Sequence, residues 1–307
     1  MTKPVILVTG ADLAQAAIEI LGNYEIIYAG KAPQESDVLA LCRQHNPLGI
    51  ILRYGGITAE MMDVAPNLRV ISKHGSGTDS IDKSAATERG IAVRAAIGAN
   101  AAAVAEHALA LMTACAKSIV HLNERTHAGH WDKATFKTQE LSGRTIGLVG
   151  LGAIGQRFAK ICDAMNMKVL GFDPYAKNIP SYVTSVDLES IQEKSDVISL
   201  HCPLTPENSQ MLNKDFFAKC KRGVIIINTA RGGLIDESAL LEAIASGTVS
   251  MAGLDSFAVE PMKTPHIFHG NQNIILTPHI GGVTNDAYIN MGVGAAKNIV
   301  ACLSEIH

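Results

Sequence analysis

Charged side chains follow three short apolar runs in the last third of the sequence. Arg231 follows IIINTA, Asp255 ends MAGLD with Glu260 five residues later, and His279 stands in TPHIGG just after NIIL. A guanidinium group is a permanently charged planar fork that suits carboxylates, and an imidazole suits proton transfer near neutrality. Taken alone, the pattern also fits a surface histidine in a turn, a structural ion pair for Arg231, and a capping or loop acid at Glu260.

The elements that must position these residues alternate along the whole chain. Short β-branched runs, separated by helical stretches, lie at 5–10, 25–30, 48–53, 69–75 and 91–96, then at 145–150, 168–173, 196–203, 223–230, 251–255 and 273–278. Nearly all-apolar strands with helices between them predict parallel sheets covered on both faces. The carboxyl ends of such strands are where open α/β sheets bind ligands.

The order of these elements predicts an α/β protein with two Rossmann-like, doubly wound parallel-sheet domains. The alanine-rich segment 100–128 has no proline or internal glycine and predicts a helix that bridges the domains. Segment 284–305 is predicted to be a helix that packs back on the first domain. A nucleotide-binding domain (100–283) is then inserted into a flavodoxin-like substrate domain (1–99 and 284–307), and a cleft between domains is a natural ligand site.

Composition excludes several classes of protein. Of 307 residues, 47% are hydrophobic and 18% charged, and the net charge of −3 has no like-charge block that would attract nucleic acid or an anionic membrane. We expect no signal peptide and no membrane span. The six cysteines are scattered without a CxxC pair, which favours reduced thiols in a cytoplasmic protein over disulfides or a metal site.

A glycine loop marks the start of the second series of strands. Gly150, Gly152 and Gly155 form a GxGxxG pattern between an apolar strand and an amphipathic helix, and Asp173 ends the next strand. These glycines permit a tight turn, a close approach to a pyrophosphate and close helix–strand packing. Asp173 suits an adenosine ribose and would repel a 2′-phosphate, which predicts NAD rather than NADP. The alternative is a glycine turn in a Rossmann-like domain that binds nothing.

Six motifs together resemble the D-isomer-specific 2-hydroxyacid dehydrogenase family, most closely its 3-phosphoglycerate dehydrogenase branch. They are GLVGLGAIG, NTARGGLIDESAL, AGLDSFAVEP, TPHIGG, SKHGSGTDSIDKSAATERGI and VAEHALALM. The resemblance covers nearly the whole chain. It implies an NAD-dependent oxidoreductase that interconverts a small D-2-hydroxy acid and its 2-keto acid.

The resemblance also implies roles for single residues. Arg231 would bind the substrate carboxylate and polarise the keto oxygen, His279 would be the general acid or base, and Glu260 would fix the imidazole tautomer and favour its protonated form. Asp255 would assist near the nicotinamide or brace the Arg231 loop. Further cofactor contacts are expected at Ala153, Ile154, Cys202, Pro203, Thr229, Ala230 and Gly281.

On the substrate side, Ser76 and Gly77 match a family loop whose backbone N–H groups meet the carboxylate. Arg53 matches an arginine that the phosphoglycerate branch places near the cleft, or is a surface arginine; Asn100 matches the pattern or caps the following helix. Arg94 is either a reader of a second anionic group or a solvated side chain. Because Arg53 is followed by Tyr-Gly-Gly instead of the family's usual residues, 3-phosphoglycerate, hydroxypyruvate and glyoxylate all remain open as substrates.

The partners expected are a small 2-hydroxy or 2-keto acid and a second copy of the chain, with segment 121–141 and Trp131 as the arm between subunits of a homodimer. Because the sequence ends at His307, we expect no regulatory domain. The alternative function is an NAD(H)-binding sensor or co-repressor on the same fold with little turnover. Formate oxidation is disfavoured because enzymes of that type have glutamine where Glu260 stands.

Overall fold

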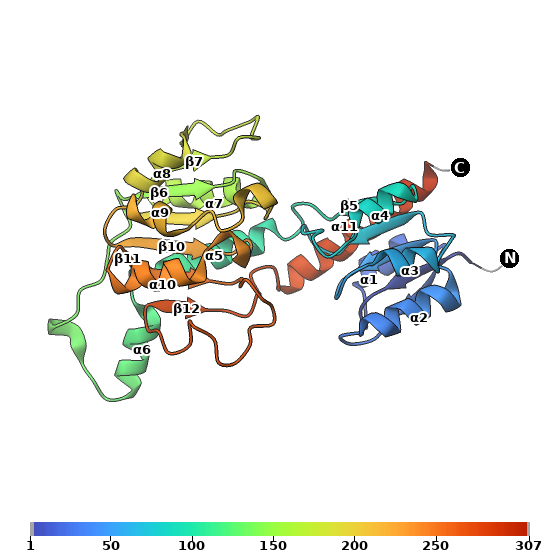
Figure 1. Cartoon of the computed structure of the whole chain (residues 1–307), viewed down its shortest axis with the longest axis horizontal. Coiled ribbons are helices and arrows are strands. Elements are labelled where there is room, and N and C mark those ends of the chain that lie inside the picture. Colours follow the sequence, from blue (N-terminus) through green and yellow to red (C-terminus); the bar gives the residue numbers. More distant parts are fainter. Residues whose placement is uncertain (1–2, 306–307) are drawn as a thin grey trace. The chain divides into compact units, whose positions relative to one another are not determined.

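A computed structural model describes residues 3–305 and divides the chain into two compact units. Unit 1 runs up to Asn100 and resumes at Val283, and unit 2 is Ala101–Gly282, so unit 2 is inserted into unit 1. Figure 1 shows unit 2 in green to orange and the returning C-terminal helix of unit 1 in red. The predicted domain limits, 99/100 and 283/284, each differ by one residue from the limits of these units, 100/101 and 282/283.

Unit 1 contains a parallel sheet of five strands in the order β2-β1-β3-β4-β5 within the described residues. Its strands are β1 (Val5–Val8), β2 (Glu25–Tyr28), β3 (Gly49–Leu52), β4 (Val70–Lys73) and β5 (Ala92–Ala95). Its helices are α1 (Gln15–Ile20), α2 (Glu35–His45), α3 (Ala59–Asp63), α4 (Lys83–Glu88) and α11 (Asn285–Ser304). The strand order reverses between β1 and β3, and this is a topological switch point.

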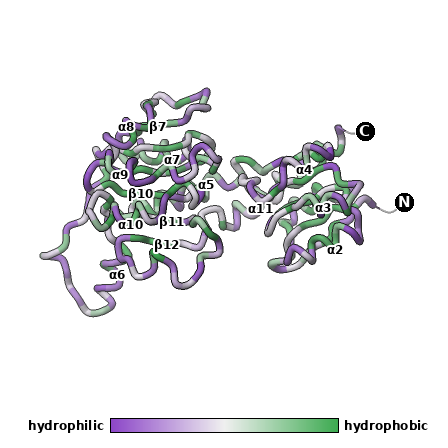
Figure 2. The backbone as a smooth tube through the Cα atoms, in the orientation of Figure 1, coloured by the Kyte–Doolittle hydropathy of each residue, from purple (hydrophilic) through white to green (hydrophobic). Residues whose placement is uncertain are grey.

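Helices cover both faces of this sheet because successive strand residues point to opposite faces. Ile6 and Val8 pack with α11 and α1, whereas Leu7 packs with α2, α3 and α4. The strands are hydrophobic along most of their length (Figure 2), as the apolar runs predicted. The prediction that the C-terminal helix packs on the first domain is confirmed by the contacts of α11 with α1 and with β3, β4 and β5.

Unit 2 contains a parallel sheet in the order β12-β11-β10-β9-β6-β7-β8. Its strands are β6 (Thr145–Val149), β7 (Lys168–Phe172), β8 (Val183–Ser185), β9 (Val197–Leu200), β10 (Val224–Asn228), β11 (Val249–Leu254) and β12 (Ile274–Leu276). This sheet has seven strands within residues 3–305, so the prediction of six strands for this domain was wrong by one. β8 was missed because it is a three-residue edge strand with two exposed residues, too short for a hydrophobic period.

The helices of unit 2 again form two layers. α5 (Ala101–Ala116) and α7 (Ala153–Ala164) pack on one face, and α8 (Leu188–Lys194), α9 (Lys214–Ala218) and α10 (Glu237–Ala245) pack on the other. Short 3₁₀ helices lie at η1 (Asp132–Ala134), η2 (Pro206–Asn208) and η3 (Gly232–Leu234). All six cysteines are free thiols, and four of them are buried.

The prediction of one bridging helix over 100–128 was wrong. The segment forms α5 and α6 (Ile119–His127), bent by 60° at a break where Ser118 has a φ of 49°. α5 belongs to unit 2 because its alanine-rich face is buried against α7, β10 and β11, whereas α6 buries none of its residues. Between residues 3 and 305 no single helix has the length and apolarity to cross a membrane; the bent α5–α6 pair meets that test on length and composition alone.

Candidate active site

The glycine loop joins β6 to α7, and two of its glycines are required by close backbone contacts. A Cβ on Gly150, whose φ is 99°, would lie 2.7 Å from the Cys202 nitrogen, and one on Gly155 would lie 2.1 Å from the Gly150 oxygen. A Cβ on Gly152 would meet no atom within 4 Å. Gly152 is the residue that precedes the first turn of α7, so open space lies beside the unpaired N–H groups of a helix N-terminus, which suits an anion.

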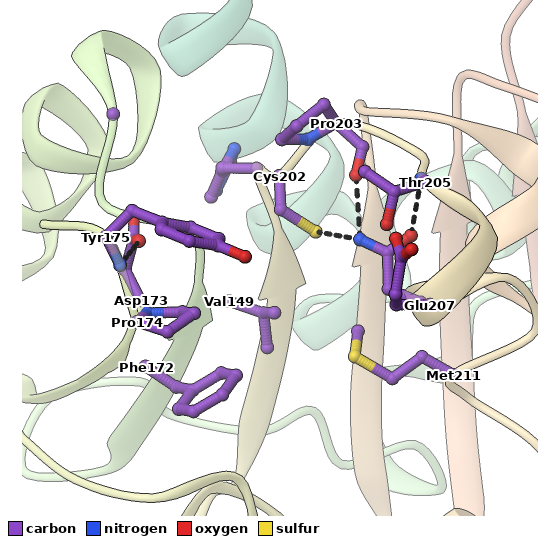
Figure 3. A pocket seen from close by; sticks show the side chains of 14 residues that line it. Val149, Phe172, Asp173, Pro174, Tyr175, Cys202, Pro203, Thr205, Glu207 and Met211 are labelled. Atoms are coloured by element: carbon purple, nitrogen blue, oxygen red, sulfur yellow. Dashed lines mark hydrogen bonds between the residues drawn. The ribbon is translucent and has the colours of Figure 1, made fainter.

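Asp173 is tied to this loop by its carboxylate. It accepts hydrogen bonds from the Leu151 nitrogen (2.8 Å) and the Tyr175 nitrogen (2.9 Å). Asp173 follows β7 directly and faces a pocket of about 420 Å³. Tyr175 and Pro174 border this pocket on one side, and Cys202, Pro203 and Thr205 on the other (Figure 3).

The pocket brings together part of the predicted cofactor set. Its lining includes Gly150, Gly152, Asp173, Cys202 and Pro203, but not the other predicted contacts Ala153, Ile154, Gly155, Thr229, Ala230, Asp255 and Gly281. Its lining also includes residues outside the predicted set, namely Val149, Phe172, Pro174, Tyr175, His201, Thr205, Glu207, Asn208 and Met211. The run LTPEN directly after the third predicted strand of unit 2 could have signalled Thr205, Glu207 and Asn208, since loops at carboxyl ends bind ligands.

Two glycine substitutions should separate folding from cofactor binding. We expect Gly152→Ala to leave the melting temperature nearly unchanged and to weaken NADH binding by at least ~10-fold, because the methyl group takes space that a pyrophosphate needs. Gly155→Ala should lower the melting temperature, because its Cβ meets backbone rather than a movable side chain. Thermal unfolding and NADH fluorescence titration test both; full NADH affinity in Gly152→Ala would refute the assignment of the loop.

The loop that carries His279 is held by hydrogen bonds to Asp255. The buried Asp255 carboxylate accepts hydrogen bonds from the Thr277 hydroxyl (2.6 Å), the Ile280 nitrogen (2.9 Å) and the Gly281 nitrogen (2.8 Å). His107 of α5 adds its Nε2 at 3.0 Å from the same hydroxyl. Asp255 therefore braces the His279 loop, a role that was not among those expected for it. Its distance to the Gly281 Cβ position, 2.9 Å, also explains a glycine there.

His279 itself has an uncommon backbone conformation. Its φ is 54°, in the left-handed region that most residues other than glycine avoid. Such conformations cluster where surrounding structure holds a functional side chain in place, and the bonds to Asp255 supply that restraint. The residue is thus fixed at the tip of β12, as its place between a proline and two glycines had suggested.

Glu260 and His279 form a hydrogen-bonded pair. The His279 Nδ1 lies 2.6 Å from Glu260 Oε2, and Glu260 Oε1 accepts from the Phe257 nitrogen at 2.9 Å. The pKa of His279 is raised, chiefly by the hydrogen bond to Glu260, which outweighs burial. Burial alone would raise the pKa of Glu260, but its hydrogen bonds from His279 and Phe257 lower it. The pair therefore favours an imidazolium beside a carboxylate.

The His279 Nε2 faces away from this bond, and the side chain is 44% exposed. A ring whose one nitrogen is held and whose other is accessible can give or take a proton at the accessible atom.

Arg231 lies at the carboxyl end of β10, close enough for its charge to lower the pKa of both Glu260 and His279. Its Nη1 donates to the Ala230 carbonyl at 2.8 Å, and Asn228 Nδ2 donates to the Arg231 carbonyl at 2.9 Å. The next residue, Gly232, approaches Phe257 so closely that a Cβ would lie 1.9 Å from its carbonyl carbon. The structure thus brings the three predicted charged residues together at one sheet edge.

Of the predicted substrate residues, Arg231 and His279 lie in unit 2, and Arg53, Ser76 and Gly77 lie in unit 1. Arg53 follows β3, and Ser76 and Gly77 follow β4, so they share the carboxyl edge of that sheet. The Ser76 hydroxyl donates to Asn100 Oδ1 at 3.2 Å, which links two of the predicted positions. Arg94 lies within β5, with its side chain exposed and its Nη1 bonded to the adjacent Val93 carbonyl.

Two neighbours of Arg53 were missed from sequence. The Arg53 guanidinium forms an ion pair with Asp12, and Tyr288 of α11 donates a hydrogen bond to the same carboxylate at 3.0 Å. No local pattern could have signalled them, because they lie 41 and 235 residues away from Arg53 along the chain.

Comparisons with known proteins place the chain in a family. A family model described as "D-isomer specific 2-hydroxyacid dehydrogenase, NAD binding domain" matches residues 109–281. A hydroxypyruvate reductase of Thermotoga maritima is 39% identical over 290 residues, which are 94% of each chain. A D-3-phosphoglycerate dehydrogenase of Archaeoglobus fulgidus is 41% identical over 80% of this chain, but that match spans only 47% of the relative, about half its length. The crystal structure of the TT0316 protein from Thermus thermophilus has a TM-score of 0.89 at 35% identity, covering 98% of this chain and 97% of that one.

Proposed function

This chain belongs to the D-isomer-specific 2-hydroxyacid dehydrogenase family and is an NAD-dependent oxidoreductase, and from that premise we propose that it interconverts a small D-2-hydroxy acid and its 2-keto acid through Arg231, Glu260 and His279. Hydroxypyruvate, glyoxylate and phosphohydroxypyruvate are the keto acids in question. The observation that carries the proposal is the 2.6 Å bond between His279 and Glu260 within range of the Arg231 charge.

The residues of unit 2 fit the NAD that the family binds. The space beside Gly152 accepts a pyrophosphate, and Asp173 borders the pocket where a ribose would lie. The Thr229 hydroxyl, directly after β10, is buried and has no hydrogen-bond partner among residues 3–305, so it is available to a bound cofactor. NAD supplies or accepts the hydride when bound; the protein's own residues bind the acid and move the proton.

In this proposal His279 carries the proton. In the direction of keto reduction, protonated His279 donates from Nε2 to the keto oxygen as that oxygen gains charge; in the reverse direction, neutral His279 accepts the hydroxyl proton. Glu260 holds Nδ1–H, so the tautomer that leaves Nε2 free is the one favoured. The raised pKa of His279 keeps more of it protonated at neutral pH and so suits reduction.

Arg231 binds the substrate carboxylate in the same proposal. A guanidinium can donate two parallel hydrogen bonds to a carboxylate, and this fixes the plane of the acid relative to His279. The bond of its Nη1 to the Ala230 carbonyl restrains the side chain before substrate arrives. The carboxylate is therefore held on one side of the reacting carbon and the proton donor on another.

Replacing Glu260 with glutamine tests the pairing through its pH dependence. The raised pKa of His279 depends chiefly on Glu260, so the pKa should fall in Glu260→Gln. Reduction requires the protonated ring, and its kcat/KM declines as pH rises through that pKa; the decline should move to lower pH. The rising limb for oxidation, which requires the neutral ring, should move the same way. Glu189→Gln, which removes an exposed partner of Lys219, is the control; an unmoved profile in Glu260→Gln would rule out the pairing.

Turnover itself is the primary test of the function. NADH oxidation at 340 nm should be measured with hydroxypyruvate, glyoxylate, phosphohydroxypyruvate, pyruvate, oxaloacetate and 3-sulfopyruvate. We expect saturable turnover with at least one of them. NADH binding without turnover on any acid would favour the sensor or co-repressor function instead.

We also propose that the protein forms a homodimer through the segment 121–141 and its surroundings. Trp131 is 81% exposed, and Ile119, Val120 and Phe136 are exposed close to it in sequence. Exposed apolar groups gathered on one segment are typical of a protein interface. We expect the native protein to have twice the mass of the chain by light scattering, and Trp131→Glu to shift it toward the monomer; a monomeric native protein would refute the proposal.

A further inference from the structure

Glu260 lies on a long connection that has no regular secondary structure. Residues 255–273, the described segment between β11 and β12, contain neither helix nor strand. A carboxylate oxygen of Glu260 nevertheless lies 2.6 Å from the Nδ1 of His279, and this distance depends on where the connection places its backbone. Contacts with other elements must therefore hold the connection in place around Glu260.

Glu237, the first residue of α10, contacts this connection on both sides of Glu260. Its Oε1 accepts a hydrogen bond from the nitrogen of Ala258, two residues before Glu260, at 3.1 Å. Its Oε2 lies 3.4 Å from the Nε2 of His266, six residues after Glu260. One carboxylate at the start of a helix thus holds the connection both before and after Glu260.

The contacts of His266 direct its ring hydrogen toward Glu237. The His266 Nδ1 accepts a hydrogen bond from the Phe268 nitrogen at 3.3 Å, so the ring hydrogen is carried by Nε2. The ring centroid lies 5.0 Å from that of Phe268 and 6.3 Å from that of Phe257, and both phenyl groups are buried in the core of unit 2. His266 is therefore held as a hydrogen-bond donor that faces the Glu237 carboxylate.

The contact between Glu237 and His266 is shielded from water. Their side chains are 18% and 15% exposed, so solvent screens this contact less than it screens a surface pair. Glu242 of the same helix, by contrast, is 64% exposed and pairs with the 81% exposed Lys214. A carboxylate in the first turn of a helix also stabilises the helix itself. A role for Glu237 beyond that one must therefore appear in the chemistry of the site as well as in stability.

We propose that Glu237 is a positioning residue that holds Glu260 against His279. The inference rests on the proposed function, because it gives Glu237 an effect on the proton carrier of that reaction. Without the Glu237 carboxylate, the connection loses its contacts with α10 at Ala258 and His266, and Glu260 holds the imidazole less firmly.

The consequence for His279 follows from the cause of its pKa. The hydrogen bond to Glu260 is the chief reason that this pKa is raised, so a displaced Glu260 should let it fall. Asp255 and Arg231 also act on the ring, the first raising its pKa and the second lowering it, and both remain in every variant of Glu237. Loss of Glu237 should therefore act in the same direction as loss of the Glu260 charge.

Glu237→Ala and Glu237→Gln should be compared with the wild type, each alone and combined with Glu260→Gln. Glutamine can keep one of the two contacts of Glu237 but not both, because its amide nitrogen only donates. Glu242→Gln is the matched control in the same helix. The readouts are the pH dependence of kcat/KM for reduction, the melting temperature, and the titration of the His279 ring by NMR in protein with isotope-labelled histidine. The spectrum of His279→Ala identifies the signal of that ring.

In Glu237→Ala we expect kcat for reduction to fall by about 10- to 10²-fold, the cost of a misplaced catalytic group. The decline of kcat/KM and the His279 titration should both move to lower pH, as in Glu260→Gln, and Glu237→Gln should lie between the wild type and Glu237→Ala. In the Glu260→Gln background, Glu237→Ala should move neither of them further, because residues that act through one contact are not additive. If Glu237→Ala does not fold, Glu237→Gln decides.

The inference is overturned if the pH profile and the His279 titration of both Glu237 variants equal those of Glu242→Gln, even where the melting temperature falls, since a residue that only stabilises α10 has that effect alone. A full further shift in the Glu260→Gln background also overturns it, because Glu237 would then act by another route. If no keto acid is turned over but the His279 titration still moves as expected, the proposed function fails and the inference stands. Turnover with an unmoved titration leaves the function standing and the inference refuted.

Discussion

His279→Ala is expected to lower kcat for keto-acid reduction by about 10²- to 10⁴-fold, the usual contribution of a positioned general acid. The loss should appear mainly in kcat, since the ring acts on the keto oxygen as charge develops there, and less in substrate binding. His279 is well placed for this, because Glu260 holds its Nδ1 and the side chain is 44% exposed. Steady-state kinetics at saturating NADH measure the effect.

Two controls separate chemistry from folding in that variant. NADH affinity should remain within a few-fold of the wild type, because the glycine loop lies in a different part of unit 2. His45→Ala, at the C-terminal end of α2 in unit 1, should retain full activity. A His279→Ala protein that keeps more than about one tenth of the wild-type kcat would contradict the assignment.

Arg231→Lys is expected to lower kcat/KM by about 10²- to 10³-fold, although it keeps the positive charge. A lysine ammonium is a point charge on a flexible stem and cannot replace a planar fork that binds a carboxylate through two parallel bonds. It would also lose the Nη1 bond to the Ala230 carbonyl that restrains the side chain. The expected loss of kcat/KM corresponds to about 2.7–4.1 kcal/mol of transition-state binding, at about 1.36 kcal/mol for each tenfold change.

Arg222→Lys is the matched control for this substitution, since Arg222 is an exposed arginine just before β10 in the same unit. Its kcat/KM should remain near that of the wild type. The loss in Arg231→Lys should fall on every keto acid alike, because all share the carboxylate. A loss confined to one substrate would instead place Arg231 against the variable part of the acid.

Much of the fold could be predicted from sequence because its signals are local. Short apolar runs between helical stretches predicted the strands. Only β8 was missed within the described residues, since a three-residue edge strand with two exposed residues has no hydrophobic period to detect. The break between α5 and α6 also escaped. No proline or glycine marks it; Ser118 adopts a left-handed conformation where a buried helix meets an exposed one.

The charged residues of the candidate site could be predicted for a topological reason. Arg231, Glu260 and His279 each follow a strand, and parallel strands end at the same edge, so their proximity follows from strand order without any knowledge of side-chain contacts. The glycine loop could also be predicted, because its three glycines lie within six consecutive residues between an apolar run and an amphipathic segment.

The class of fold, the cofactor loop and the residue types available for chemistry could thus all be predicted from the amino-acid sequence. The groups that those residues contact could be found only in the folded structure. Asp255 forms hydrogen bonds to the His279 loop from 22 to 26 residues earlier in the sequence. Asp12 forms an ion pair with Arg53, which lies 41 residues later. Contacts of this kind depend on the distance and direction between side chains that only packing brings together, and hydrophobic periodicity and turn chemistry carry no record of them.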